Sequence, residues 1–265
     1  MKPTPVHQFS SILAMITLVI AFVCTAVAGD EILEEIVEQD YPLDPNSKFT
    51  LKNDEGSVRI YGHELPEMKV QAIKKAYTKD RLQKIDVNVS VQPGNVSIKT
   101  KYPPKPRWGL FDRSGTVDYV IVLPWSCDVK QVELGNGELV IDGMRGNEVR
   151  AQLGNGRLFG HNCFSDVHLS VQSGDLAVGY DWWEDNAIAL DTSIADGDAH
   201  LYIPSDAQFR LHAEGSDGIY NDFSRKEDRT REEPTKMDLS IGTSPNGDLK
   251  VRALDGSIKI EELYP

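Results

Sequence analysis

The sequence predicts an all-β fold, a single-chain β-solenoid or β-roll built from short strands with glycine turns. The first observation is a phrase that recurs along residues 132–201: an apolar residue, two small or polar residues, a glycine, any residue and a second apolar residue. Its glycines lie 19, 18 and 23 residues apart, and a fixed period of about 20 residues is typical of stacked repeats. The copies are centred on Leu134 with Gly137, Leu153 with Gly156, Val171 with Gly174, and Ile194 with Gly197.

The second observation is the alternation of apolar and polar residues on both sides of each glycine. Successive side chains of a strand point to opposite faces, so the apolar ones share one face. We expect them to form ladders along a continuous core. Before the glycines they are Val149, Ala151 and Leu153, then Val167, Leu169 and Val171, then Ile188 and Leu190, with Phe209, Leu211 and Ala213 further on; after the glycines they are Leu139 and Ile141, Leu176 and Val178, Leu201 and Ile203.

The sequence also predicts strands in the part of the chain that precedes the repeats, residues 30–123. Residues 30–38 fit an acidic amphipathic helix, because their apolar residues have helical spacing, but they also fit the start of a first strand. Both readings stay open, with strand favoured towards the end of the segment. Further on, alternation and glycine signals predict strands at 48–52, 57–61, 69–73, 85–91, 96–98 and 117–123, with a glycine turn at 53–56.

Two stretches interrupt the pattern. Residues 101–114 contain three prolines and are expected to be an irregular excursion. Residues 225–236 are mostly charged and contain Pro234, which indicates a solvated surface loop. The chain closes with expected strands at 237–241, 248–252 and 256–260, and the last of these repeats the opening segment 55–60 almost residue for residue.

The first 28 residues have the features of a signal peptide. Lys2 is followed by an apolar run from Ile12 to Val23 and by the small-residue site Ala26-Val27-Ala28. We therefore expect residues 1–28 to be removed and residues 29–265 to form the β-strand-repeat domain, with no stable membrane span after cleavage. The protein would be periplasmic, at the cell surface or secreted, and the sequence leaves the final compartment open.

The chain is acidic, with 28 basic and 41 acidic residues and a net charge of −13. This balance argues against nucleic acid and anionic lipid as partners, because both bind basic patches. Two cysteines follow the signal peptide, Cys127 and Cys163. They lie about two repeats apart, and two rungs of ~4.8 Å each exceed the reach of a disulfide. We expect two free, buried thiols.

Candidate binding residues are few. Trp182 and Trp183 are expected to lie on a strand and so to point to opposite faces, so that one is exposed and able to stack on a sugar or a partner. The alternative is that Trp182 and Trp183 are packed into a bend between two rungs. The segments Asp196-Gly197-Asp198 and Asp217-Gly218 are explained by turn chemistry as well as by calcium, and we expect no metal and no cofactor.

The opening segment and the repeats together carry a resemblance. Residues 53–62 (Asn-Asp-Glu-Gly-Ser-Val-Arg-Ile-Tyr-Gly) followed by residues 68–72 resemble the start of a bacterial putative-adhesin family of exported β-strand-repeat proteins. The resemblance covers about Val37 to Ile260. It implies a β-solenoid or β-roll and supplies no catalytic residues. The proline-rich and charged stretches depart from the family pattern.

These observations predict a non-enzymatic module of the cell envelope. It would present an extended β face to a polysaccharide or protein partner, since an extended surface gains affinity from many weak contacts. The alternative is an envelope polysaccharide-active enzyme that uses acidic residues on the solenoid face, for which Asp191, Asp196 and Asp198 are the candidates. The sequence leaves the ligand and the oligomeric state open.

Overall fold

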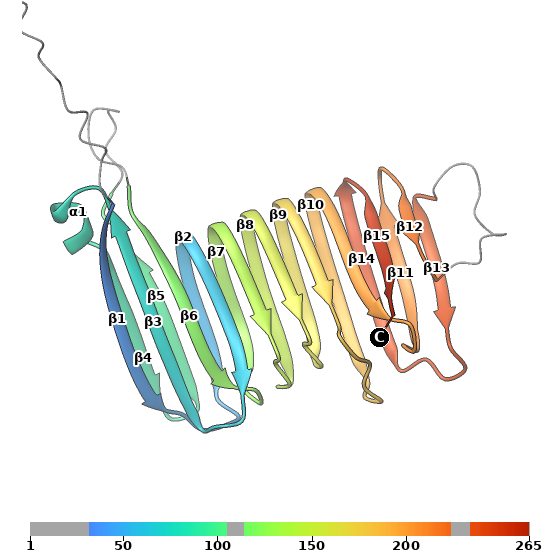
Figure 1. Cartoon of the computed structure of the whole chain (residues 1–265), viewed down its shortest axis with the longest axis horizontal. Helices are drawn as coiled ribbons and strands as arrows, with labels where there is room; N and C mark the ends of the chain where they lie inside the picture. Colours follow the sequence, from blue (N-terminus) through green and yellow to red (C-terminus); the bar gives the residue numbers. More distant parts are fainter. Residues whose placement is uncertain (1–31, 105–113, 224–233, 265) are drawn as a thin grey trace, which may run out of the picture. The chain divides into compact units, whose positions relative to one another are not determined.

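The computed structural model describes residues 32–104, 114–223 and 234–264. In these ranges the chain forms 15 strands, all connected in one hydrogen-bonded network, and one short helix (Figure 1). The predicted all-β solenoid is confirmed. The predicted signal peptide, most of the 101–114 excursion and most of the 225–236 loop lie outside the described residues.

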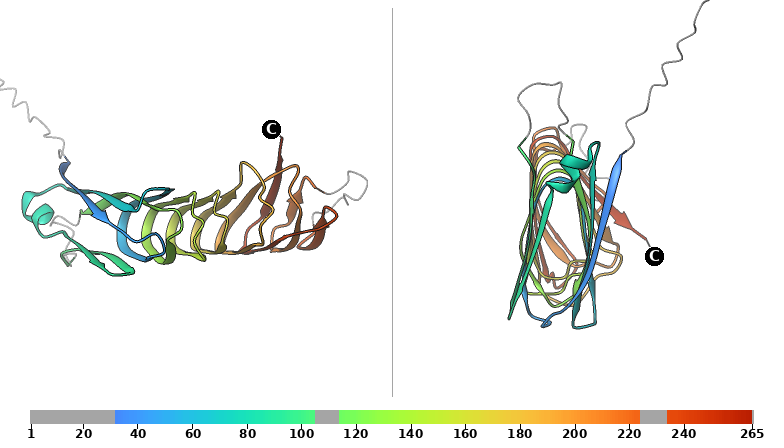
Figure 2. Two further views of the ribbon diagram at one scale, coloured as in Figure 1. Left: turned by 90° about the horizontal axis from the view of Figure 1, so that it is seen from below. Right: turned by 90° about the vertical axis from the view of Figure 1, so that its left-hand side faces the viewer.

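Each central rung is a single long strand that bends sharply near its middle. β7 (Asp128–Asp142) runs through one sheet, bends at Gly137 and continues in a second, facing sheet (Figure 2). We call the residues before the bend the first arm and those after it the second arm. The same course is taken by β2 (Lys48–His63), β8 (Glu148–His161), β9 (Asp166–Gly179) and β10 (Ile188–Pro204).

The bend glycines form a stack. Gly137 pairs in register with Gly156, and all six bend glycines have φ between 125° and 151°, a region that side chains disfavour. A Cβ on Gly156 would lie 1.9 Å from the carbonyl oxygen of Gly137. The predicted glycine turns are therefore corners at which a strand passes from one sheet to the other. The predicted short strands are the two halves of these long strands, and each half pairs with the corresponding half of the neighbouring rung. The stack comprises Gly56, Gly137, Gly156, Gly174, Gly197 and Gly256.

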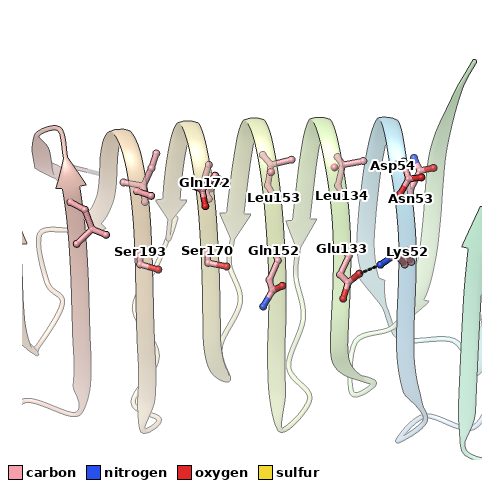
Figure 3. A pocket seen from close by; sticks show the side chains of 16 residues that line it. Lys52, Asn53, Asp54, Glu133, Leu134, Gln152, Leu153, Ser170, Gln172 and Ser193 are labelled. Atoms are coloured by element: carbon pink, nitrogen blue, oxygen red, sulfur yellow. Dashed lines mark hydrogen bonds and ion pairs between the residues drawn. The ribbon is translucent and has the colours of Figure 1, made fainter. Parts of the chain in front are cut away.

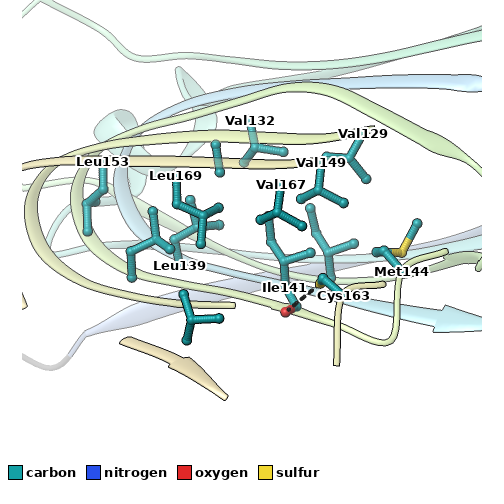
Figure 4. Close-up of a cluster of buried hydrophobic side chains, with 14 of the residues drawn as sticks. Val129, Val132, Leu139, Ile141, Met144, Val149, Leu153, Cys163, Val167 and Leu169 are labelled. Atoms are coloured by element: carbon teal, nitrogen blue, oxygen red, sulfur yellow. Dashed lines mark hydrogen bonds between the residues drawn. The ribbon is translucent and has the colours of Figure 1, made fainter. Parts of the chain in front are cut away.

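The core fills the space between the two arms. Parallel pairing in register places like residues above one another, as the alternation predicted (Figure 4). Burial of each such aliphatic side chain contributes about 1.5–3 kcal/mol. One ladder of the first arm is Leu134, Leu153, Val171 and Ile194, and one ladder of the second arm is Leu139, Leu158, Leu176 and Ala199.

The rungs at the C-terminal end do not follow the order of the sequence. β14 (Gly247–Asp255) and β15 (Ile258–Leu263) lie between β10 and the earlier pair β11 (Phe209–Gly215) and β12 (Ile219–Asn221). Asp198 of β10 accepts hydrogen bonds from both the main chain and the hydroxyl of Ser257. Segment 209–213 therefore does not stack directly on the β10 rung, because the last rung of the chain occupies that place. β13 (Lys236–Ile241) pairs antiparallel with β11 at the edge of the first-arm sheet.

At the N-terminal end the two arms are extended by separate strands. β5 (Asn95–Lys101) and β4 (Asp86–Gln92) extend the first arm, whereas β6 (Thr116–Pro124), β3 (Glu67–Ala76) and β1 (Leu33–Pro42) extend the second. The first predicted segment is thus a strand, paired over all ten residues with β3. The short helix α1 (Lys79–Gln83) covers this end, where Arg81 donates to the main-chain oxygens of Pro103, Pro104 and Ser114. Among the described residues, no helix is long and apolar enough to cross a membrane.

Candidate functional site

The edge opposite the glycine bends is built from short loops that lead from one rung to the next. Main-chain hydrogen bonds join neighbouring loops: Arg145 N–H donates to Trp125 O at 2.6 Å, and Phe164 N–H donates to Met144 O at 3.0 Å. The loops are therefore held in a stack, as the strands are. We call this the loop edge; its loops are residues 125–127, 143–147, 162–165 and 180–187.

Four side chains on successive loops form an aromatic row. The guanidinium of Arg145 lies 5.6 Å from the ring centroid of Trp125 and 5.0 Å from that of Phe164. Phe164 in turn lies 5.5 Å from Trp182. Trp125 is 39% exposed and Trp182 is 45% exposed, so the row offers two accessible indole rings that flank a buried phenylalanine and a cation.

Glu184 links two members of the row, Arg145 and Trp182. Its carboxylate lies 2.5 Å from the guanidinium of Arg145 and accepts a hydrogen bond from the indole N–H of Trp182 at 3.1 Å. The charge of Arg145 is therefore balanced within the site. The rings are fixed by neighbours on three loops, and a prearranged surface loses less conformational entropy on binding.

Trp182 and Trp183 have different surroundings. Trp183 packs against the rings of Tyr180 and Phe209, and its indole N–H donates to Asn246 at 3.0 Å. Trp182 faces solvent. The expected strand geometry is wrong at this point, because β9 ends at Gly179 and both tryptophans lie in the following loop. The binding role of the pair stays a prediction.

The loop that carries Trp182 is anchored by a polar network. His161 lies between two carboxylates, with Nδ1 3.1 Å from Asp142 and Nε2 3.2 Å from Asp181. Asn162, which has a φ of 47°, donates to the Asp181 carboxylate and accepts from its main-chain N–H. The hydrogen bonds from Asn162 and His161 lower the pKa of Asp181 below its ordinary value. The residue before Trp182 is therefore fixed on both sides.

Sequence reasoning missed Trp125, Arg145 and Phe164. They belong to the loops rather than to the recurring phrase, and their residue types differ. The signal that could have found them is their spacing, because Trp125, Arg145, Phe164 and Trp182 follow one another at 20, 19 and 18 residues. That is the period of the rungs themselves.

A second surface lies on the outer face of the first arm, beside the glycine bends (Figure 3). It is an open groove of about 460 Å³ that crosses β2, β7, β8, β9 and β10 and ends at Leu254 of β14. Its floor includes Gly135, Gly154 and Ala195, where side chains are absent or small. We call it the bend groove.

The acidic candidates for catalysis have structural partners. Asp191 pairs with Arg252 at 2.8 Å, Asp198 accepts from Ser257, and Asp196 accepts from the hydroxyl of Ser173 at 3.3 Å. Within the described ranges, no group of three or more His, Cys, Asp or Glu side chains is arranged to hold a metal ion.

The two cysteines are free and buried, as predicted. Burial raises the pKa of the Cys127 thiol to about 11 and that of the Cys163 thiol to about 12. A reactive cysteine needs the opposite shift, because the thiolate is the nucleophile. Both thiols therefore belong to the core.

Comparison with known proteins agrees with this architecture. The sequence profile of a family described as Toastrack DUF4097 matches residues 38–261. The chain belongs to this family. The resemblance to putative adhesins is thereby confirmed at the level of a family without an assigned function. None of the curated proteins compared with this Toastrack chain matches it.

The chain is similar to several solved structures at low sequence identity. A "putative cell adhesion protein" from Clostridium sporogenes is 17% identical, with a TM-score of 0.50 over 86% of this chain and 100% of the other. A "putative adhesin" from Bacteroides fragilis is 12% identical, with a TM-score of 0.32 over 86% of this chain and 97% of the other. A "putative lipid binding protein" from Parabacteroides distasonis is 10% identical, with a TM-score of 0.34 over 85% and 97%.

Proposed function

We propose that the protein is an exported, non-enzymatic binding module that holds an envelope polysaccharide through its aromatic row. The observation that supports this most strongly is the pair of exposed indole rings of Trp125 and Trp182, fixed on stacked loops around Arg145 and Phe164. Flat aromatic faces pack against the apolar faces of sugar rings, and tryptophan is enriched where partners are anchored.

The design of the row suits weak, repeated contacts. Its two exposed rings, Trp125 and Trp182, lie on the first and the last of the four successive loops, so a long ligand can contact both at once, and modest contacts add up along a polymer. The name given to the Clostridium sporogenes protein is consistent with adhesion as the role. A protein partner is the other class of ligand for such a row, since exposed tryptophan and arginine also anchor protein interfaces.

The experiment is a pelleting assay of the purified protein with isolated, insoluble envelope polysaccharide. We expect saturable pelleting that weakens about tenfold in Trp182→Ala and in Trp125→Ala, because each loses a stacking face. Tyr77→Ala is the matched control, since Tyr77 is 50% exposed and lies next to Ser114, at the end of β6 opposite the loop that carries Trp125.

Three outcomes would redirect the assignment. Pelleting that is unchanged in both tryptophan variants would remove the aromatic row from the site. Release of soluble sugar fragments during incubation would indicate an enzyme. Absence of pelleting by the unmodified protein would overturn polysaccharide binding and leave a protein partner to be sought.

A further inference from the structure

The bend groove has free hydrogen-bonding groups at regular intervals. Gln152, Ser170 and Ser193 occupy the same register position on β8, β9 and β10, and Figure 3 shows their side chains side by side. None of the three makes a side-chain hydrogen bond to another described residue. Gln172, two residues beyond Ser170 on β9, also lines the groove and is likewise unpaired within the described chain. Neighbouring donors and acceptors are thus one rung, ~4.8 Å, apart.

The charged side chains that line the groove lie at its N-terminal end. There Lys52 and Glu133 form an ion pair of 2.6 Å, and Asp54 adds a carboxylate. The middle of the groove is lined by amides, hydroxyls, glycines and the methyl group of Ala195. On a protein whose net charge is −13, this stretch is suited to an uncharged ligand, because a charged one would find no opposite charge to compensate its loss of water.

The backbone beneath the groove is already fully engaged in the sheet. β8 pairs with β7 on one side and β9 on the other, and β9 pairs with β8 and β10 through the same residues. An extended peptide cannot add itself as a further strand here, since that mode of binding needs a free sheet edge. Recognition must therefore run through side-chain amides and hydroxyls.

We infer that the bend groove is a second binding site, which takes a linear, uncharged polysaccharide laid across the rungs. Hydroxyl groups along such a chain can pair with Gln152, Ser170, Gln172 and Ser193, while the small floor residues allow the sugar rings to approach the backbone. The site lies at the opposite edge of the rungs from the aromatic row, and it does not depend on that row.

The test is affinity electrophoresis of the full chain through gels that contain a soluble neutral β-glucan, a neutral mannan or, as the charged comparison, polygalacturonate. We expect retardation by at least one neutral polymer and none by polygalacturonate. Ser170→Tyr should weaken retardation at least tenfold, because an outward ring fills the groove. The matched control is Asp175→Tyr, which places the same ring on the outer face of the second arm of the same strand.

A second variant keeps the test valid if Ser170→Tyr fails to fold. The double change Gln152→Ala and Gln172→Ala removes hydrogen-bonding groups from exposed positions, and we expect about tenfold weaker retardation. Retardation that is equal in the unmodified protein and in the groove variants, or stronger with polygalacturonate than with the neutral polymers, would overturn the inference, as would no retardation at all. The same groove changes made in a Trp182→Ala background should still weaken retardation about tenfold, so failure of the groove and failure of the aromatic row are distinguishable.

Discussion

At the bend edge each rung turns on one glycine, whereas at the loop edge it returns through a loop of 3 to 8 residues. The bend glycines lie so close to the carbonyl oxygens of the rung before them that no side chain fits. The loops have room for tryptophan, arginine and phenylalanine. The requirement for glycine is thus confined to the bend edge, and side chains of many types fit at the loop edge. Binding residues in the loops can therefore change without disturbing the bend of the strand.

The largest expected effect is at the bend edge. Gly156→Ala would place a Cβ 1.9 Å from the oxygen of Gly137 at a φ of 130°. We expect a loss of about 3 kcal/mol or more in the free energy of unfolding, because neither the strain nor the clash with backbone can be relieved by a side-chain movement. Urea denaturation measures it.

The control for this change is Gly94→Ala. Gly94 also has a positive φ, of 70°, but a Cβ there would meet no atom within 4 Å. We expect it to cost about 1 kcal/mol, the penalty of the left-handed conformation alone. Equal losses in the two variants would show that close rung packing is not what requires glycine at the bends.

An intermediate effect is expected from comparing two neighbours at the loop edge. Trp183→Ala should cost about 2 kcal/mol, because this ring packs on Tyr180 and Phe209 and its N–H is bonded to Asn246. Trp182→Ala should cost under about 1 kcal/mol, since the ring is half-exposed. Thermal unfolding should separate the two variants by several degrees, and a larger loss for Trp182 would assign that ring to stability rather than to binding.

The last expected effect depends on pH and concerns two aspartates that accept hydrogen bonds from the serines that follow the bend glycines Gly56 and Gly256. Asp118 accepts from Ser57 as Asp198 does from Ser257. Hydrogen bonds from Ser257 lower the pKa of Asp198; at Asp118 burial raises the pKa, but the bonds from Lys75 and Ser57 outweigh it and lower it. A lowered pKa in the folded state stabilises the fold above the ordinary value of about 3.9, and this contribution is lost as the pH falls through the folded-state pKa.

The corresponding substitution is Asp198→Asn, with Asp118→Asn as its counterpart at the other end. We expect each to cost about 1 kcal/mol at pH 7 and to flatten the fall in stability below about pH 4. Denaturation midpoints at pH 7 and in the acid range measure this. An unchanged pH profile in both variants would show that the charges of Asp118 and Asp198 do not contribute to the free energy of unfolding.

The candidate site was predicted only in part, for a reason that the two tryptophans illustrate. Trp182 and Trp183 are conspicuous in the sequence because they are adjacent. Trp125, Arg145 and Phe164 are single residues of three different types, and the contact between them depends on the loops being stacked. The bend groove is harder still to predict, because it is the space left by the missing side chains of Gly135 and Gly154, next to Gln152 and Ser170.

The period of the rung, its bend glycine and the apolar faces of its two arms can all be derived from the amino-acid sequence. These follow from local properties, since a glycine at a positive φ and alternating side chains act within a few residues. Which rungs are neighbours follows from the folded structure alone, where β14 and β15 lie between β10 and the pair β11 and β12. Strand pairing uses main-chain groups that nearly all residues share, so the sequence alone allows several similar strands to pair with β10. In the folded protein the strand order is accompanied by specific side-chain contacts, such as the hydrogen bond that Asp198 accepts from Ser257.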